Sequence, residues 1–295
     1  MGHKNKKSLI RQVQERLDSM LAIGESKYED KKIDLTKGKI YSWSTYKSYL
    51  QQCCQFVRYC RDNHHCKNMT ACRQYVGEWM ESRQDLSAYT QKLSASALCK
   101  LYGESLEELN ITTKRAARSE ITRSRGVAKR DAHFSEQKNA DFVEFCRSTG
   151  LRRSEITKLR GDQLIERDGE YYICTIGKGG RYREAPVCGN VELVIGKMQA
   201  AGTGKVWAKV PSNADIHSYR ADYATRVYLS HARPIEDLPR KKRYVCRRDK
   251  VGTIYDRQAM LIASQALGHN RIDVIGAHYL RLEFICNPME SYLSK

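Results

Sequence analysis

The strongest constraint on the fold is the spacing of apolar residues, which changes along the chain. Residues 41–63, YSWSTYKSYLQQCCQFVRYCRDN, place apolar side chains three and four residues apart, at Tyr46, Tyr49, Leu50, Cys53, Phe56, Val57 and Cys60. This spacing after a Ser or Thr is typical of an N-capped amphipathic helix. Residues 72–83 and 86–103 repeat the pattern, and Gly103 stands where a helix C-cap is expected. The sequence therefore predicts a helical domain over residues 41–110, preceded by a charged helical lead at 1–40.

The pattern is lost in residues 111–131, ITTKRAARSEITRSRGVAKRD, which are rich in basic side chains. We interpret 111–132 as a basic linker, either a solvated interdomain segment or a strap along a phosphate backbone. Beyond it, residues 133–150 predict a capped helix, and residues 170–187, EYYICTIGKGGRYREAPV, predict a β-hairpin around their glycines. The chain from about residue 190 is expected to be helical. The second domain, 133–295, should thus be mainly α with a small β element.

The amino-acid composition limits the kinds of partner that these two domains are expected to bind. The 295 residues suffice for two hydrophobic cores, and 52 Lys and Arg against 34 Asp and Glu give a formal net charge of +18. Such a field favours nucleic acid as the partner, although a merely basic soluble protein has the same composition. The 11 cysteines, without a signal peptide or an apolar run of bilayer length, indicate a reduced cytoplasmic setting and no membrane partner.

One cysteine-rich segment contains residue types that bind zinc: Cys60, His64, His65, Cys66 and Cys72. Its spacing does not match a Cys-x2-Cys knuckle, and cysteines at helical spacing are also common core residues. We therefore expect no metal site.

Four segments of the second domain carry polar groups suited to a phosphate. They are Arg152 with Glu155, Lys178, His217 with Arg220, and His269 with Tyr279. The pairs at i and i+3 project from one helix face, and the glycines around Lys178 allow close backbone approach to a ligand. Taken singly, each has an ordinary explanation as a surface ion pair, a solvated lysine or packing.

Together, and in this order, TGLRRSEI, GKGGRYREAPV, HSYRADYAT and LGHNRIDVIGAHYL resemble the tyrosine recombinases, the phage integrase family of site-specific DNA recombinases. The resemblance implies a mainly α fold with a small antiparallel β-sheet. A helical core-binding domain would be joined to a mixed α/β catalytic domain of the DNA breaking-rejoining type, and the two would form a C-shaped clamp around duplex DNA.

The resemblance also implies roles for individual residues. Arg152 and Arg220 would clamp the scissile phosphate, because arginine keeps its charge and offers paired donors. Lys178 would protonate the leaving 5′ oxygen, His217 and His269 would occupy the two histidine positions, and Tyr279 would be the nucleophile. Glu155 would orient the site residues without itself contacting the substrate. Arg153, by contrast, is expected to be a solvated or DNA-backbone-contacting surface charge.

The implied activity is strand exchange in duplex DNA by an enzyme of mobile genetic elements. The reaction would pass through a 3′-phosphotyrosine and a Holliday junction, with no cofactor, metal or ATP. The expected assembly is a homotetramer on DNA, with accessory DNA-bending or excision factors as further partners. Side chains expected to contact DNA are Lys114, Arg115, Arg118, Arg123, Arg125, Lys241, Lys242 and Arg243.

Several features depart from the family pattern. Tyr219 and Ala221 stand where Leu and His are common, and residues 229–258 look like an insertion whose basic run either contacts DNA or is solvated. The interval from His269 to Tyr279 is one residue longer than the commonest spacing in the family. Tyr255 and Tyr292 are therefore kept as alternative, though poorer, candidates for the nucleophile. The apolar residues after Tyr279 pack either on their own domain or on a neighbouring subunit.

Two other functions remain open. A non-catalytic DNA-binding protein could have the recombinase fold, as the unusual Tyr219 and Ala221 suggest. A metal-dependent nuclease is disfavoured, because no cluster of carboxylates accompanies the arginines.

Overall fold

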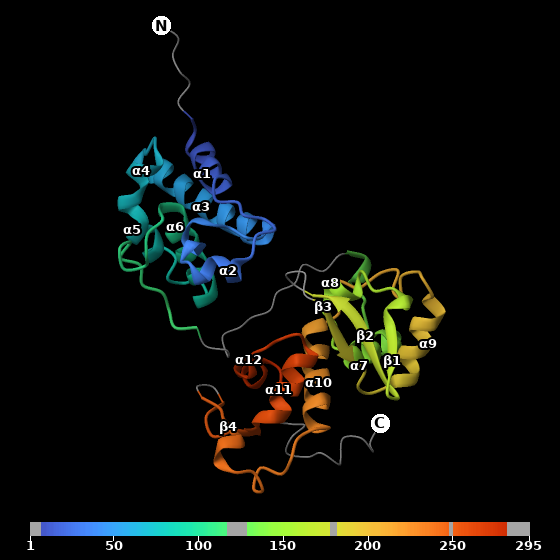
Figure 1. Ribbon diagram of the computed structural model, residues 1–295. Helices are drawn as coiled ribbons and strands as arrows, with labels where there is room; N and C mark the ends of the chain where they lie inside the picture. The colour runs from blue at the N-terminus through green and yellow to red at the C-terminus, as the bar shows by residue number, and fades with distance from the viewer. Residues whose placement is uncertain (1–6, 117–128, 178–181, 248–249, 282–295) are drawn as a thin grey trace. The chain divides into compact units, whose positions relative to one another are not determined.

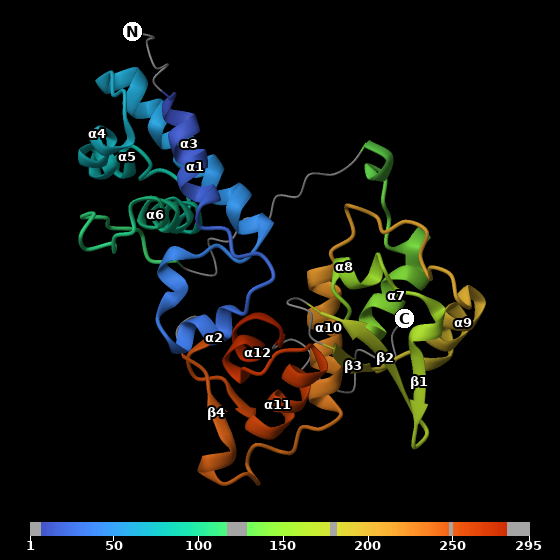
Figure 2. The same cartoon turned by 45° about the horizontal axis from the view of Figure 1, so that its top comes forward.

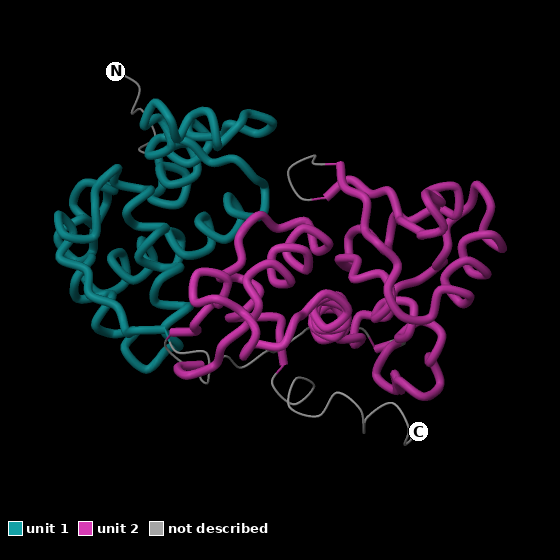
Figure 3. Tube along the Cα trace, turned by 60° about the horizontal axis from the view of Figure 1, so that its bottom comes forward, with its two compact units in different colours: residues 1–122 teal, residues 123–295 magenta. Residues whose placement is uncertain are grey.

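The chain forms two compact units, residues 1–122 and 123–295 (Figure 3), each with its own hydrophobic core. The computed structural model describes residues 7–116, 129–177, 182–247 and 250–281. Within these residues, no helix is both long enough and apolar enough to cross a bilayer.

The regular elements of the first unit are all helices over its described residues, apart from one isolated bridge between Leu21 and Ile40 (Figure 1). Its helices are α1 (Leu9–Asp18), α2 (Lys27–Lys32), α3 (Trp43–His64), α4 (Met69–Cys72), α5 (Val76–Glu81) and α6 (Ala88–Tyr102). Helix α3 begins after its N-cap residue, Ser42, and α6 ends at Gly103, as the sequence predicts. The φ angle of Gly103 is 76°. The single helix expected over 72–83 is instead broken by a 3-10 turn at Arg73–Tyr75.

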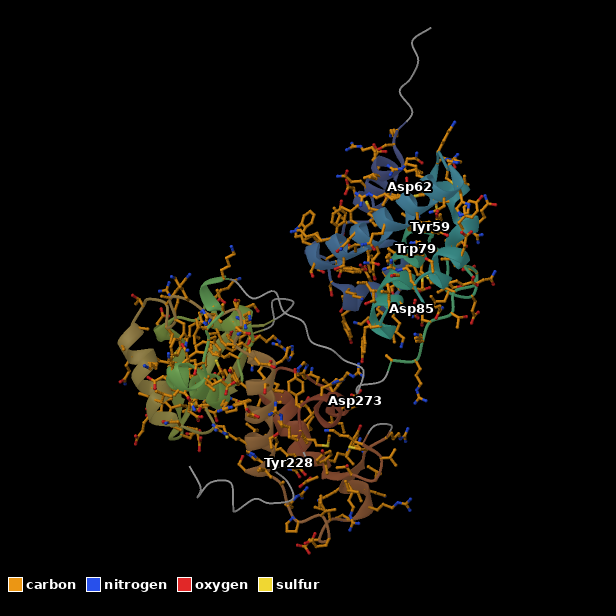
Figure 4. The ribbon with its side chains drawn as sticks, turned by 180° about the vertical axis from the view of Figure 1, so that it is seen from behind. Tyr59, Asp62, Trp79, Asp85, Tyr228 and Asp273 are labelled. Carbon is orange, nitrogen blue, oxygen red and sulfur yellow. The ribbon has the colours of Figure 1, made fainter. Side chains whose placement is uncertain are left out.

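The core of this unit lies between α3, α1 and α6. Phe56 of α3 is fully buried and meets the ring of Trp79 edge to face, with the ring centroids 5.4 Å apart. Trp79 is labelled in Figure 4. Leu17 of α1 is buried in the same cluster. The charged lead of the chain therefore supplies part of the hydrophobic core of the first unit.

The second unit combines six helices with two small sheets in its described residues (Figure 2). The helices are α7 (Ala140–Thr149), α8 (Arg153–Ile156), α9 (Val191–Ala201), α10 (Ile216–Leu229), α11 (Arg257–Ala266) and α12 (Ile272–His278). Helix α10 packs on α7 and on α11, and so joins the two hydrophobic clusters of this unit. This mainly α fold with a small antiparallel sheet confirms the predicted fold class.

The main sheet is antiparallel, in the order β1 (Leu164–Arg167), β2 (Glu170–Ile176) and β3 (Tyr182–Pro186). The last pair of β2 and β3 is Ile176 with Tyr182, so residues 177–181 connect the predicted hairpin. Thr175 pairs with Arg183, and the buried Ile173 pairs with the buried Ala185. Because side chains alternate along a strand, Arg183 lies on the same, buried face as Ala185.

The expectation that the chain is helical beyond residue 190 is wrong in one place. The insertion contains a second antiparallel sheet, β4 (Arg243–Val245) with β5 (Ile254–Asp256). Each strand has only three residues, which is too short for an alternating pattern to be visible in the sequence. Asp256 caps α11 by accepting from the backbone of Gln258, so the small sheet sets where α11 begins.

Candidate active site

Arg152 lies at the N-cap of α8, directly after the end of α7. Its backbone N–H donates to Oε2 of Glu155 at 2.7 Å, and its Nη1 donates to Oε1 of the same carboxylate at 2.8 Å. Its side chain is 26% exposed, whereas that of Glu155 is 2% exposed. The carboxylate thus fixes the arginine from the protein interior and leaves one side of the guanidinium accessible.

Arg220 of α10 is almost fully buried. Its guanidinium donates to the carbonyl oxygens of Gly150 and Leu267, the latter at 3.1 Å. Arg152 donates to the same Leu267 oxygen at 3.3 Å. Burial lowers the pKa of Arg220 to about 10, so the side chain still carries its charge at neutral pH. Two cations therefore converge on the carbonyls at the C-terminal end of α11, where the helix dipole favours positive charge.

Glycine is needed at two turns of this arrangement. Gly150 ends α7 with a φ of +56°, and a Cβ there would lie 2.1 Å from the ring of Tyr223. Gly268, with a φ of +72°, follows α11, and a Cβ there would lie 2.7 Å from the side chain of Arg183. The glycines of the TG and LGH motifs are thus explained by left-handed backbone and by close approach of side chains.

A cavity of about 610 Å³ opens beside the two arginines. It is lined by Arg152, Arg153, Ser154, Ile216, His217 and Arg220. His217 is exposed and lies one helical turn before Arg220 on α10. The structure therefore brings three of the predicted residues, Arg152, His217 and Arg220, to one concave surface.

His269 and Tyr279 extend this cluster. The Tyr279 hydroxyl lies 3.4 Å from Nε2 of His269, and the Arg220 guanidinium lies 5.9 Å from the centroid of the Tyr279 ring. Burial, followed by the charges of Arg220, Arg152 and Arg183, lowers the pKa of His269 to about 4. His269 is consequently neutral at pH 7 and able to accept a proton.

The segment around Tyr279 is fixed on its own unit. Leu280 is buried, and Arg281 donates to Oγ of Ser218 at 2.6 Å and forms an ion pair with Asp222 at 2.9 Å. Lys250 of the insertion donates to the carbonyl oxygens of Gly276 and Leu280 at 2.7 and 2.6 Å. Residues 280 and 281 thus pack in cis, and the rest of the tail lies outside the described residues.

Of the two alternative tyrosines, Tyr255 is described, and it does not lie in the cluster. Tyr255 of β5 is fully buried, with its ring 5.6 Å from that of Tyr228 (labelled in Figure 4). Tyr292 lies outside the described residues. Tyr219 donates to Glu136 at 2.7 Å, and Ala221 is buried in the core, so both unusual residues have structural roles.

Some predicted residues lie outside the described part of the chain, namely Lys178, Arg118, Arg123 and Arg125. Of the other predicted DNA contacts, four are exposed: Lys114, Arg115, Lys241 and Lys242. Arg243 is half-buried, because it donates to the carbonyl oxygens of Leu238 and Glu236.

Arg153, expected to be a solvated or DNA-backbone-contacting surface charge, is half-buried and binds the protein's own backbone. Its guanidinium donates to the carbonyl oxygens of Pro211 and Ala214, both at 2.6 Å, and so holds the loop before α10. The sequence reasoning also missed Arg183, which donates to Oε2 of Glu155 at 2.7 Å. Its position, two residues before Ala185 on a half-buried strand, was a signal that could have placed it inside.

No group of three His, Cys, Asp or Glu side chains suited to a metal ion occurs within the described ranges. In the cysteine-rich segment, the Cys60 thiol donates to the carbonyl of Cys72, and His64 stacks on Tyr75 with ring centroids 3.6 Å apart. Packing within the first unit therefore accounts for these side chains.

No model of a known protein family matches the chain. No curated protein matches it either. Among solved structures, the XerH site-specific recombinase bound to palindromic difH substrate, a post-cleavage complex, has a TM-score of 0.53 at 14% identity and covers 96% of this chain and 94% of its own. XerH in a pre-cleavage complex with difH substrate (TM-score 0.46, 14% identity, 95% and 94% covered) and XerA recombinase (0.29, 12%, 92% and 100%) also match. The first likeness establishes that the chain has the fold of a site-specific recombinase, which is the fold predicted from its four motifs.

Proposed function

We propose that this chain is a tyrosine site-specific DNA recombinase, which cuts and rejoins duplex DNA through a 3′-phosphotyrosine intermediate and a Holliday junction. One observation carries the proposal: Arg152 and Arg220, far apart in sequence, converge on the end of α11 beside the Tyr279–His269 pair. The recombinase fold is consistent with this chemistry.

In the proposed cleavage step, the Tyr279 oxygen attacks a DNA phosphorus and the bond from phosphorus to the 5′ oxygen breaks. The attacking hydroxyl must lose a proton, and the neutral Nε2 of His269 is 3.4 Å from it. The five-coordinate phosphorus carries more negative charge than the diester, and Arg152 and Arg220 would stabilise it with preorganised donors. Lys178 would give a proton to the leaving 5′ oxygen.

Rejoining is the reverse reaction with a 5′ hydroxyl from another strand. The bond energy is kept in the phosphotyrosine, so the proposed cycle needs no ATP and no metal. Exchange between two sites requires two DNA duplexes, and a tetramer on DNA is the assembly that we propose for it.

DNA contacts beyond the reacting phosphate are proposed for the exposed cations named above and for the insertion. A cavity of about 970 Å³ next to β4 and α12 is lined by Arg240, Arg243, Arg247, Arg257 and Arg271. Asp273, labelled in Figure 4, is the one carboxylate among its described lining residues, and it pairs with Arg271. This excess of arginine suits the phosphates of duplex DNA.

The test is capture of a covalent adduct on a DNA substrate with a nick next to the cleavage point, which traps the intermediate. The wild-type chain should form an adduct that resists denaturation, and Tyr279→Phe should form none. Tyr255→Phe is the matched control and should still form the adduct, because Tyr255 packs in the core. Specific DNA binding without any adduct from the wild-type chain would instead identify a non-catalytic DNA-binding protein, and an adduct from Tyr279→Phe would assign the nucleophile elsewhere.

A further inference from the structure

Arg183 is the side chain that links the β-sheet to the arginine cluster. It lies on β3, and its side chain is 9% exposed. Its Nη2 donates to Oε2 of Glu155 at 2.7 Å, and its Nη1 donates to the carbonyl oxygen of Ala266, the last residue of α11. A single guanidinium therefore joins the main sheet, α8 and α11.

The Glu155 carboxylate is shared between two arginines. Oε1 accepts from Nη1 of Arg152, while Oε2 accepts from the backbone of Arg152 and from Arg183. Burial alone would raise the pKa of Glu155, but the charge of Arg183, followed by the hydrogen bonds of Arg152, lowers it. Arg183 thus favours the ionised form of Glu155, which accepts charge-assisted hydrogen bonds from both arginines.

The end of α11 receives three guanidinium groups. Arg183 binds the carbonyl of Ala266, while Arg152 and Arg220 bind that of Leu267. Arg183 also fills the space beside Gly268, where a Cβ would lie 2.7 Å from its Cδ. His269 follows this turn directly, so the position of Arg183 constrains both the paired arginine and the histidine.

We propose that Arg183 is a positioning residue for phosphoryl transfer, acting through Glu155 and the end of α11 rather than by contact with the phosphate. Arg152 and Arg220 line the cavity at the candidate site, whereas Arg183 is not among the described residues that line it, and both of its Nη atoms bind protein acceptors. The inference rests on the proposed function, because the geometry that it maintains is that of Arg152 and His269. Loss of Arg183 removes the largest cause that lowers the Glu155 pKa and one of the two guanidiniums that hold the carboxylate.

The first test measures single-turnover cleavage of the nicked substrate at saturating protein, together with the Kd for the same DNA. Arg183→Gln should cleave about 10- to 100-fold more slowly, the range expected when a preorganised donor is displaced. The Kd should change by less than about threefold, because the proposed role of Arg183 involves no contact with DNA. Arg167→Gln removes an exposed arginine from β1 of the same sheet and should match the wild type in both measurements.

A double-mutant cycle separates positioning through Glu155 from general loss of packing. If Arg183 acts through Glu155, then Arg183→Gln combined with Glu155→Gln should be no slower than the slower single variant. Rates that multiply across the two substitutions would overturn the proposal, as would wild-type cleavage by Arg183→Gln. Should Arg183→Gln fail to fold, Arg183→Lys retains the charge and is expected to cleave faster than Glu155→Gln; the opposite order would also overturn it.

A readout independent of cleavage is the pKa of Glu155, followed by NMR of the free chain. It should be higher in Arg183→Gln than in the wild type, because the charge of Arg183 is the largest cause that lowers it. An unchanged Glu155 pKa would overturn the inference. Absence of any adduct from the wild-type chain would instead reject the proposed function and leave this measurement valid.

Discussion

At the scale of single residues, the structure lowers the pKa of His269, a side chain that ordinarily titrates near neutral pH. Burial and the charges of Arg220, Arg152 and Arg183 act together on its imidazole, and Glu155 offsets them only in part. Because these effects lower its pKa to about 4, the ring is neutral over the whole physiological range. In the proposed reaction, the imidazole next to Tyr279 would therefore be unprotonated at neutral pH.

We predict that NMR titration of the free protein will give His269 a pKa near 4, with His269→Gln used to assign its signal. The folded state then binds fewer protons than the unfolded state between about pH 4 and the unfolded pKa of about 6.5, so folding stability should rise with pH across this window. His269→Gln should lose that part of the pH dependence in urea unfolding. A His269 pKa of 6 or above would contradict the arginine-dominated site.

A second prediction at this scale concerns Gly150. Gly150→Ala combines a φ of +56° with a Cβ that would meet the Tyr223 ring at 2.1 Å, and we expect a loss of at least about 2 kcal/mol in the free energy of unfolding. Gly196→Ala on α9 is the control, because nothing lies within 4 Å of its added Cβ, and it should be neutral or stabilising by up to about 1 kcal/mol. Urea unfolding of both variants measures these changes. Equal effects of the two substitutions would mean that the turn after α7 rearranges to accommodate the added methyl group.

At the scale of elements, α10 is positioned by a loop as well as by its core face. Arg153 holds that loop through the carbonyls of Pro211 and Ala214, and His217 follows at the start of the helix. We predict that Arg153→Gln lowers the free energy of unfolding by about 1–3 kcal/mol, as expected for lost charge-assisted hydrogen bonds. Thermal unfolding checks this result, with Arg160→Gln, an exposed arginine of the same unit, as the control. Equal melting temperatures for the wild type and Arg153→Gln would mean that the loop does not depend on this side chain.

The elements also show what the sequence could and could not predict. The long helices and the hairpin were predictable, because their apolar periods extend over many residues. The strands β4 and β5 were not, because three residues carry no period. Arg152 and Arg220 could be placed through their motifs, whereas the interior position of Arg153 depends on carbonyls about sixty residues away, which no local pattern reports.

At the scale of the whole molecule, the net charge of +18 sets the expected response to salt. The logarithm of the DNA-binding constant falls linearly with the logarithm of the salt concentration. If arginines of the insertion cavity contact DNA phosphates, each contact adds about 0.9 to the steepness of this fall. The double variant Arg240→Gln with Arg257→Gln should therefore reduce this slope by about 2. Lys205→Gln with Lys209→Gln removes the same charge from exposed positions outside the cavity and should leave the slope unchanged. Equal slopes for the two double variants would exclude the cavity from the DNA interface.

The two anchors around Tyr279 limit how far an attached DNA end could travel. Lys250 holds the carbonyls of Gly276 and Leu280, and Arg281 is bound to Ser218 and Asp222 of α10. The peptide that carries Tyr279 can therefore move very little while these hydrogen bonds and this ion pair persist. If a strand is joined to Tyr279, the joined end stays at the enzyme, and the free 5′ end is the partner that must move during exchange.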